Sequence, residues 1–237
     1  MNSRAARITE IFSSLQGEGP YLGAKQIFIR FADCNLTCSY CDEGKTRRTN
    51  TGKSYSVRQL AAVIARLDKR RGPHEAISFT GGEPLLQADF LQKLLPLLKK
   101  NGHKIYLETN GTLARAYKRI ARFVDVVAMD MKLPSMLGGQ NHLNAHRDFL
   151  KEAVHKNVFV KIVYGPTTRL SEILACARII ACVSPKVLLV LQPQSAAGQR
   201  QAKDLIERAC DTFYPKLAAI LKNVRVIGQM HKVWGVR

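Results

Sequence analysis

The chain has 237 residues, of which 46% are apolar and 23% charged, and its 37 basic and 18 acidic residues give a net charge of +19. This composition is that of a globular protein, and it excludes a disordered or fibrous chain. No apolar stretch reaches the roughly 20 residues of a membrane-spanning helix, and none near the start suits a secretory signal, so we expect a cytoplasmic protein without a membrane partner.

Apolar runs of strand length alternate with segments of helical period along most of the chain. The predicted strands are Gln26–Phe31, Ala76–Phe79, Lys104–Glu108, Val124–Met129, Val158–Val163, Val187–Leu191 and Val224–Ile227. The predicted helices are Val57–Arg70, Ala88–Lys100, Leu143–Lys156, Ser171–Cys182 and Ala202–Leu221. Ser56 is placed to cap the first helix and Gly102 to end the second, whereas Pro96 predicts a kink or an early break in the second.

This alternation of strands and helices implies a parallel sheet covered by helices. About six β/α units are too few for the closed eight-stranded barrel, so we expect an α/β fold of one domain, built as a partial, open β/α barrel. The polar motifs TGGEP and ETNG follow predicted strands. Because functional groups of such folds gather at the carboxyl ends of the strands, we expect the site there.

Three cysteines stand within eight residues directly after the first predicted strand, namely Cys34, Cys38 and Cys41. Iron–sulfur clusters are usually bound by four thiolates, so three ligands without an adjacent fourth would leave one iron open for a substrate or cofactor. A structural zinc site, the main alternative, would need a fourth Cys or His, and the nearest downstream histidine, His74, is far from the loop. The three remaining cysteines fall in predicted helices and are expected in the core: Cys176, Cys182 and Cys210.

Two motifs resemble the signatures of the radical S-adenosylmethionine (SAM) superfamily. CNLTCSYC matches its CxxxCxxC motif, with Tyr40 before the last cysteine, and FTGGEP resembles the GGE motif that meets the methionine end of SAM. The resemblance implies a single radical SAM domain over residues 1–237, with a cluster loop at residues 32–55. One [4Fe–4S] cluster would be held by Cys34, Cys38 and Cys41, and SAM would chelate the open iron.

The wider sequence resembles the 7-carboxy-7-deazaguanine synthase family. EIFSSLQGEGPYLGAKQIFIRFADCNLTCSYCD is similar to the amino-terminal region of that family, and TGGEPLLQ, LETNGT, MDMKLPS, VLQPQ and QMHKVWGVR have counterparts in the same order. The resemblance implies a lyase that converts 6-carboxy-5,6,7,8-tetrahydropterin to 7-carboxy-7-deazaguanine with loss of ammonia, in the biosynthesis of queuosine and related deazapurines. Its cofactors would be the cluster, SAM and Mg²⁺.

Two other functions are open alternatives. Another radical SAM enzyme, such as a glycyl-radical activase, shares the cysteine spacing but acts on a protein, and it would not need SLQGEG and Arg30 disposed as a small-molecule pocket. A non-enzymatic zinc or nucleic-acid-binding module is favoured only by the basic charge. The basic residues are spread along the chain and aromatic residues are scarce, so nucleic acid is not the expected partner.

The family resemblance also implies roles for individual residues. The expected substrate contacts come from Leu15, Gln16, Gly17, Arg30 and Thr80. Arg30 would pair with the substrate carboxylate, because a planar guanidinium can bind a carboxylate through two hydrogen bonds. The expected SAM contacts come from Tyr40, Cys41, Asp42, Gly82, Asp130, Lys132 and Gln192.

The chain departs from the family pattern just after the last cluster cysteine. The family usually has Thr after Cys-Asp, and its hydroxyl helps to hold Mg²⁺, whereas this chain has Glu43. A carboxylate is a competent ligand for such a hard cation. Either Glu43 takes the role of the Thr, or metal use and even the substrate differ here.

The resemblance further implies two protein partners. A homodimer is expected, and so is a flavodoxin or ferredoxin as the electron donor. Such donors are typically acidic, and a strongly basic surface would suit their docking by electrostatic steering. Some relatives also use their carboxyl-terminal residue at the substrate, so Arg237 is a further candidate.

Overall fold

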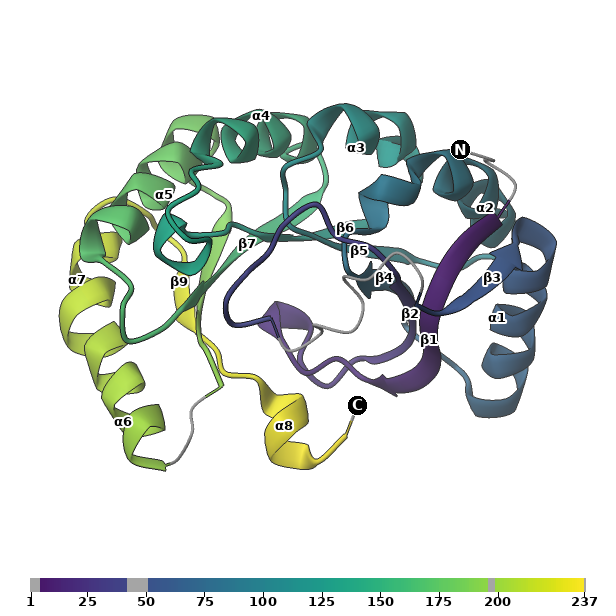
Figure 1. The fold of residues 1–237 in the computed structure, drawn as a ribbon, viewed down its shortest axis with the longest axis horizontal. Coiled ribbons are helices and arrows are strands. Elements are labelled where there is room, and N and C mark those ends of the chain that lie inside the picture. The colour runs from purple at the N-terminus through teal and green to yellow at the C-terminus, as the bar shows by residue number, and fades with distance from the viewer. Residues whose placement is uncertain (1–4, 42–50, 196–198, 237) are drawn as a thin grey trace.

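The protein is described by a computed structural model that covers residues 5–41, 51–195 and 199–236. One sheet of nine strands runs through these residues in the order β3-β1-β2-β4-β5-β6-β7-β8-β9. Its two end strands, β3 and β9, do not pair with each other, so the sheet stays open. The helices follow the outer side of the curved sheet as an arc, and α8 lies at the open side of that arc (Figure 1). The predicted α/β fold, a partial and open β/α barrel, is confirmed.

The strands are β1 (Ala5–Leu15), β2 (Lys25–Phe31), β3 (Lys53–Ser56), β4 (Ala76–Gly81), β5 (Ile105–Thr109), β6 (Val126–Asp130), β7 (Asn157–Tyr164), β8 (Leu188–Pro193) and β9 (Val224–Val226). The helices are α1 (Val57–Arg71), α2 (Ala88–Lys100), α3 (Ala114–Ile120), α4 (Leu143–Ala153), α5 (Leu170–Val183), α6 (Gln199–Arg208), α7 (Tyr214–Ala218) and α8 (Met230–Trp234). Strand β2 and strands β4 to β9 are parallel, whereas β1 pairs antiparallel with both β2 and β3.

All seven predicted strands are found, and so are four of the five predicted helices. Strands β1 and β3 and the short helices α3 and α8 were not predicted, and β3 takes up the last part of the expected loop at residues 32–55. The single helix predicted over Ala202–Leu221 is instead α6, a π-helical turn (Ala209–Phe213) and α7. Pro96 does not break α2, because its neighbours Leu94, Leu95 and Leu98 anchor that helix in the core on both sides of the proline.

The predicted cap of α1 is confirmed. Ser56 Oγ accepts a hydrogen bond from Gln59 N at 3.3 Å, and Gln59 Oε1 accepts one from Ser56 N at 2.8 Å. This reciprocal pair satisfies two backbone donors that the first turn of a helix leaves without partners. It therefore starts α1 immediately where β3 ends.

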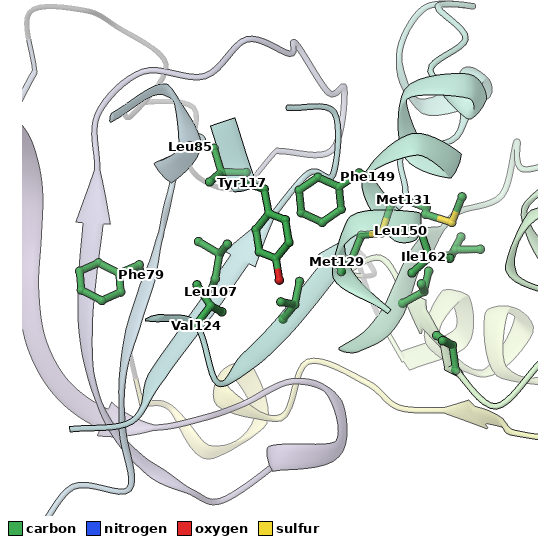
Figure 2. Close-up of a cluster of buried hydrophobic side chains, with 14 of the residues drawn as sticks. Phe79, Leu85, Leu107, Tyr117, Val124, Met129, Met131, Phe149, Leu150 and Ile162 are labelled. Carbon is green, nitrogen blue, oxygen red and sulfur yellow. The ribbon is translucent and has the colours of Figure 1, made fainter. Parts of the chain in front are cut away.

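The main core lies between the sheet and the outer helices. Figure 2 shows part of it, where Tyr117 of α3 and Phe149 of α4 pack over Leu107 and Met129 of the sheet. The rings of Tyr117 and Phe149 have centroids 4.9 Å apart, and both residues are fully buried. Burying a side chain of this size contributes roughly 1.5–3 kcal/mol, so this layer fixes the helices on the outer face.

The inner face of the sheet carries a second and smaller apolar cluster, made of Ala76, Tyr106, Val126, Ala128, Phe159 and Val190. Side chains alternate between the two faces of a strand, so the residue two places after an inner apolar residue also points inward. In β6 this places Asp130 beyond Ala128, and in β7 it places Lys161 beyond Phe159. The inner face is thus apolar along the middle of the strands and polar at their carboxyl ends.

The expectation that the three remaining cysteines lie in the core holds for one of them. Cys176 is fully buried, whereas Cys182 and Cys210 are exposed. Both exposed cysteines lie in helical segments, on the side that faces solvent rather than the sheet. Among the described residues, no helix combines the length and the apolar character that crossing a membrane requires.

Candidate active site

A cavity of about 680 Å³ opens at the carboxyl ends of the strands. It is lined by all predicted site residues that the structure describes: Leu15, Gln16, Gly17, Arg30, Cys34, Cys38, Tyr40, Cys41, Thr80, Gly82, Asp130, Lys132 and Gln192. Asp42, Glu43 and Arg237 lie outside the described residues. Segments far apart in the sequence therefore meet in one place, and that place is the edge of the sheet that the strand pattern indicated.

The three loop cysteines lie at one end of this cavity. Cys38 is 8% exposed and packs with Leu36 and Leu137, and the other two cysteines contact the same apolar cluster. The loop is tied to the rest of the protein by Ser39, whose N–H donates to Met136 O at 3.0 Å. Burial raises the pKa of the Cys34 and Cys38 thiols. A bound cation would therefore be needed to hold these sulfurs as thiolates.

These thiols fit the ligand chemistry of an iron–sulfur cluster. Within the described ranges, no three His, Cys, Asp or Glu side chains converge closely enough to hold a single metal ion. A four-iron cluster is much wider than one ion, and its thiolate ligands stand correspondingly farther apart. Soft sulfur ligands without a nitrogen or oxygen partner suit such a cluster, whereas a structural zinc site needs four ligands within bonding distance of one point.

The GGE turn packs tightly against the start of the cluster loop. Glu83 N donates to Asp33 O at 2.7 Å, and Gly82 N donates to Phe31 O at 3.0 Å. A Cβ atom added at Gly82 would lie only 1.8 Å from Asp33 O. No side chain fits there, so glycine lets the two loops approach each other next to Cys34.

Glu83 holds a third loop in the same place. Its carboxylate accepts hydrogen bonds from Thr109 Oγ1 at 2.8 Å and from Asn110 N at 2.7 Å. Complete burial raises the pKa of Glu83 to about 7, although these donors and Leu85 N favour the ionised form. Asn110 in turn reaches Asn35 at 2.8 Å. Glu83 thereby joins the loop after β5 to the loop that carries the cysteines.

Lys132 links the cluster loop to the carboxyl end of β6. Its ammonium donates to Asp130 Oδ2 and to the hydroxyl of Tyr40, each at 2.8 Å. Burial disfavours its charged form, but the charge of the Asp130 carboxylate and the hydrogen bond to it outweigh this and raise the pKa of Lys132 well above its ordinary value. Lys132 therefore stays positively charged and holds Tyr40 next to the last cysteine.

His146 of α4 lies beneath Lys132 and is fully buried. Its Nε2 accepts a hydrogen bond from Lys132 N at 3.1 Å, and Nδ1 lies 3.1 Å from Gly111 O, which assigns the proton to Nδ1. Burial lowers the pKa of His146 from 6.5 to about 4, with His142 acting in the same direction. The neutral imidazole thus holds two site loops together.

We predict that this histidine makes the stability of the protein depend on pH. The pKa of His146 is lower in the folded state than in the unfolded chain, so its full contribution to the free energy of unfolding is present above pH 6.5 and is lost as the pH falls to about 4. The free energy of unfolding should fall by about 3 kcal/mol from this group alone over that range. Urea unfolding at several pH values measures it, and His146→Gln should flatten the profile.

The matched control for this measurement is His155→Gln, because His155 is exposed. This variant should keep the pH dependence of the parent protein. Equal profiles for the parent and His146→Gln would contradict the assignment.

The opposite end of the cavity presents a hydrogen-bonded carboxylate, Glu108. Its Oε1 accepts from Gln16 Nε2 at 3.0 Å and from Ser78 Oγ at 3.3 Å, and its Oε2 accepts from Thr80 Oγ1 at 2.8 Å. A carboxylate has about four acceptor positions, so with three in use Glu108 retains about one for an N–H donor of a ligand. Because hydrogen bonds fix this carboxylate in place, it suits an aromatic ring that presents an N–H donor at its edge.

Arg30 of β2 lines the same end of the cavity. Its Nε donates to Glu10 Oε2 at 2.9 Å, and the guanidinium lies 5.8 Å from the centre of the Phe12 ring. These contacts orient the side chain from β1, the strand that the sequence pattern did not predict. The arrangement gives the cavity a cation for a ligand carboxylate.

Several polar atoms around the cavity are buried without a hydrogen-bond partner in the described residues. They include both side-chain atoms of Gln192 and the Oδ1 atom of Asp130. Buried polar groups in proteins are nearly always hydrogen-bonded, so unsatisfied atoms at a cavity indicate groups of a missing ligand. Hydroxyl and amino groups, such as those of a ribose and an adenine, would satisfy Asp130 and Gln192.

Sequence reasoning did not identify Glu18, Glu108, Lys161 and the carboxyl-terminal residues Gln229, His231 and Lys232, although all line the cavity. An isolated charge in an apolar strand was the available signal for two of them. Glu108 ends the run IYLE, and Lys161 interrupts VFVKIVY. The carboxyl-terminal residues carry no such signal, because their place depends on how the end of the chain folds back.

Comparisons with known proteins show the family to which this chain is related. Residues 28–180 match the model of the Radical SAM superfamily. The chain is 37% identical to a 7-carboxy-7-deazaguanine synthase of Geobacter sulfurreducens, with 99% of each chain covered, and 34% identical to one of Methanothermobacter thermautotrophicus, with 98% of each covered. The crystal structure of QueE from Escherichia coli covers 94% of this chain and 93% of its own, with a TM-score of 0.65 and 25% identity.

Proposed function

The chain belongs to the radical SAM superfamily and, within it, to the 7-carboxy-7-deazaguanine synthases, and from this premise we propose how its cavity performs the family's reaction. The protein is a radical SAM lyase of deazapurine biosynthesis, which converts 6-carboxy-5,6,7,8-tetrahydropterin to 7-carboxy-7-deazaguanine with loss of ammonia. A glycyl-radical activase is not favoured. The observation that carries this proposal is that one cavity is lined by the three loop thiols and also by Arg30 and Glu108.

The cofactor end would be built from the cluster loop and the GGE turn. Cys34, Cys38 and Cys41 would bind the iron–sulfur cluster, and with SAM this group supplies the 5′-deoxyadenosyl radical that abstracts a hydrogen atom from the substrate. Gly82 would leave room for the methionine part of SAM. The SAM contacts expected of Tyr40, Asp42, Lys132 and Gln192 remain part of this proposal, and Asp130 Oδ1 would accept from the ribose.

The substrate end would hold the pterin between two opposite charges. The Glu108 carboxylate would accept a hydrogen bond from the ring N3–H or the 2-amino group at its remaining acceptor position, and the Arg30 guanidinium would pair with the substrate carboxylate. Leu15, Gln16 and Gly17 would contact the ring, with Thr80 beside Glu108. Backbone atoms of this loop are already engaged within the protein, since Gln16 N donates to Ala24 O at 2.7 Å. Side chains would therefore carry most of the recognition.

One anaerobic assay tests this function. The protein is reconstituted with iron and sulfide, reduced, and given SAM, 6-carboxytetrahydropterin and Mg²⁺. Formation of 7-carboxy-7-deazaguanine is the expected result. Slow release of 5′-deoxyadenosine without that product would keep the superfamily chemistry but overturn the proposed substrate.

Substitution of Arg30 should weaken substrate binding in particular. Losing a hydrogen-bonded partner of a charged group costs about 1.5–3 kcal/mol, so the KM of Arg30→Ala for the pterin should rise about 10- to 100-fold. Uncoupled cleavage of SAM should persist in this variant. Arg30→Lys is the matched comparison, because it keeps the charge but loses the planar fork. An unchanged KM in both variants would remove Arg30 from the substrate end.

We also propose Mg²⁺ as a further cofactor, with Glu43 as a ligand. Glu43 lies outside the described residues, so the support is chemical: a carboxylate is a hard oxygen ligand of the kind that Mg²⁺ prefers. Glu43→Thr restores the residue usual in the family. The proposal fails if product formation by the parent protein and by this variant is equally independent of added Mg²⁺.

The partners would be a second copy of the chain in a homodimer, and an acidic flavodoxin or ferredoxin as electron donor in the cytoplasm. A groove between β1, β3 and α1 supports the donor, since the exposed residues Lys53, Arg66 and Arg70 line it and β3 directly follows the cluster loop. Reduction by such a donor should slow with rising salt, whereas reduction by dithionite should not. Equal salt responses would refute the docking.

A further inference from the structure

Lys161 of β7 stands between the two ends of the cavity. Its side chain is 14% exposed, and its ammonium lies 3.4 Å from Asp130 Oδ2 and forms an ion pair with Glu18 Oε2. The sheet register brings Lys161 beside Asp130, because these two residues are direct partners across β6 and β7. One cation therefore contacts two carboxylates that come from different parts of the site.

The Asp130 contact leads toward the cysteines. Asp130 Oδ2 also accepts from Lys132 Nζ at 2.8 Å, and Lys132 Nζ donates to the Tyr40 hydroxyl at 2.8 Å. Asp130 is thus fixed by two ammonium groups at one oxygen. Its other oxygen, Oδ1, is buried without a hydrogen-bond partner among the described residues.

The Glu18 contact leads toward the substrate loop and the end of the chain. Glu18 Oε1 accepts from Gln229 Nε2 at 2.8 Å, and Glu18 N donates to Gln16 Oε1 at 3.1 Å. Next to these contacts, Met230 N donates to Gly17 O at 2.9 Å. Helix α8 is therefore attached to the substrate loop through Glu18 and Gly17, at the open side of the arc in Figure 1.

Glu18 has Lys161 as its ion-pair partner, whereas Asp130 is paired with both Lys161 and Lys132. A buried carboxylate that loses its cation becomes strongly destabilising, because it is left without compensation in a poorly solvated site. Burial raises the pKa of Glu18, but the charge and hydrogen bonds of Lys161 and the hydrogen bond from Gln229 lower it to about 2. Glu18 is therefore ionised at any working pH, provided that the ammonium stays in place.

We propose that Lys161 is a positioning residue that assembles both ends of the cavity at once. It fixes Asp130 for the SAM ribose, and it fixes Glu18, with α8 behind it, for the pterin. This inference rests on the proposed function for the identity of the two ligands. The attachment of α8 through Lys161 does not depend on it.

The first test needs no ligand. Trp234 of α8 is the only tryptophan in the chain and is 40% exposed, so its fluorescence reports the docking of α8 in the full-length protein. Lys161→Met should increase the quenching of Trp234 by acrylamide, and the double variant Lys161→Met with Glu18→Gln should reverse most of the increase, because the unpaired charge is removed. Lys151→Met, on the exposed side of α4, is the control and should change nothing.

The second test uses the reconstituted protein. Lys161→Met should weaken both SAM binding and pterin binding about tenfold or more, and it should raise the ratio of 5′-deoxyadenosine to product. Glu18→Gln should weaken pterin binding alone, Asp130→Asn should weaken SAM binding alone, and Lys161→Arg should recover part of both.

The two tests separate failure of this inference from failure of the proposed function. Unchanged Trp234 quenching in Lys161→Met would overturn the attachment of α8, and a loss of affinity for only one ligand would overturn the shared role. If the parent protein made no 7-carboxy-7-deazaguanine, the proposed function would fail while the quenching result still stood.

Discussion

Cys38→Ala should lose the iron–sulfur cluster and all product formation together. Cys38 is the most buried of the loop cysteines and lies among Leu36 and Leu137, so alanine fits its place and the fold should persist. Two remaining thiolates are an incomplete ligand set for a cluster that already lacks a fourth. Iron and sulfide analysis after reconstitution measures the loss, and circular dichroism checks that the variant is folded.

The control for this prediction is another cysteine of the same chain. Cys182 is exposed on α5 and does not line the cavity, so Cys182→Ala should keep the full iron content and activity. Full iron content in Cys38→Ala would refute its assignment as a cluster ligand. Loss of iron in both variants would point to a general defect in folding or reconstitution.

Gly82→Ala should strongly reduce both SAM binding and the free energy of unfolding, because the added methyl group has no space. The added Cβ would lie 1.8 Å from Asp33 O and 2.5 Å from Asp33 C, so the start of the cluster loop must move. Its backbone is not in the left-handed region, so alanine is not strained by its own conformation. We expect a loss of about 1–3 kcal/mol in the free energy of unfolding, with SAM binding reduced 100-fold or more. Urea unfolding and equilibrium binding of SAM measure the two.

Gly228→Ala is the matched control. Apart from Gly228 and its two chain neighbours, no heavy atom of the described residues lies within 4 Å of a Cβ built there, and its backbone is also outside the left-handed region. This variant should keep the stability and the SAM affinity of the parent protein. If Gly82→Ala did the same, the tight approach of the GGE turn to Asp33 would be wrong.

Much of the fold follows from the sequence, because each parallel strand is a short apolar run followed by a helix. The expected number of about six β/α units agrees with the structure, from β2 with α1 to β8 with α6 and α7, although the helix of the β5 unit, α3, was not predicted. Strand β1 was not predicted, because its sequence AARITEIFSSL lies in a charged region and mixes polar with apolar residues on both faces. It owes its place to pairing with β2 and β3, which is a property of the tertiary structure.

The residues of the candidate site were likewise only partly predictable from the sequence. Residues inside motifs, such as Arg30, Thr80 and Lys132, were found because the family resemblance carries them. Lys161 and Glu18 were not, since their role comes from the register of two strands and from a contact 143 positions apart in the sequence. The two exposed cysteines show a further limit: a short apolar helix indicates that a residue is helical, but not on which side of the helix it lies.

The position of α8 has a consequence for how the protein is made. The three loop cysteines and the GGE turn all precede residue 84, whereas Gln229 and α8, which attach to the substrate loop, come much later in the chain. A ribosome releases the chain from its amino terminus, so the cysteines emerge long before their cavity receives this segment. A cluster delivered during synthesis would therefore meet a site that α8 has not yet joined.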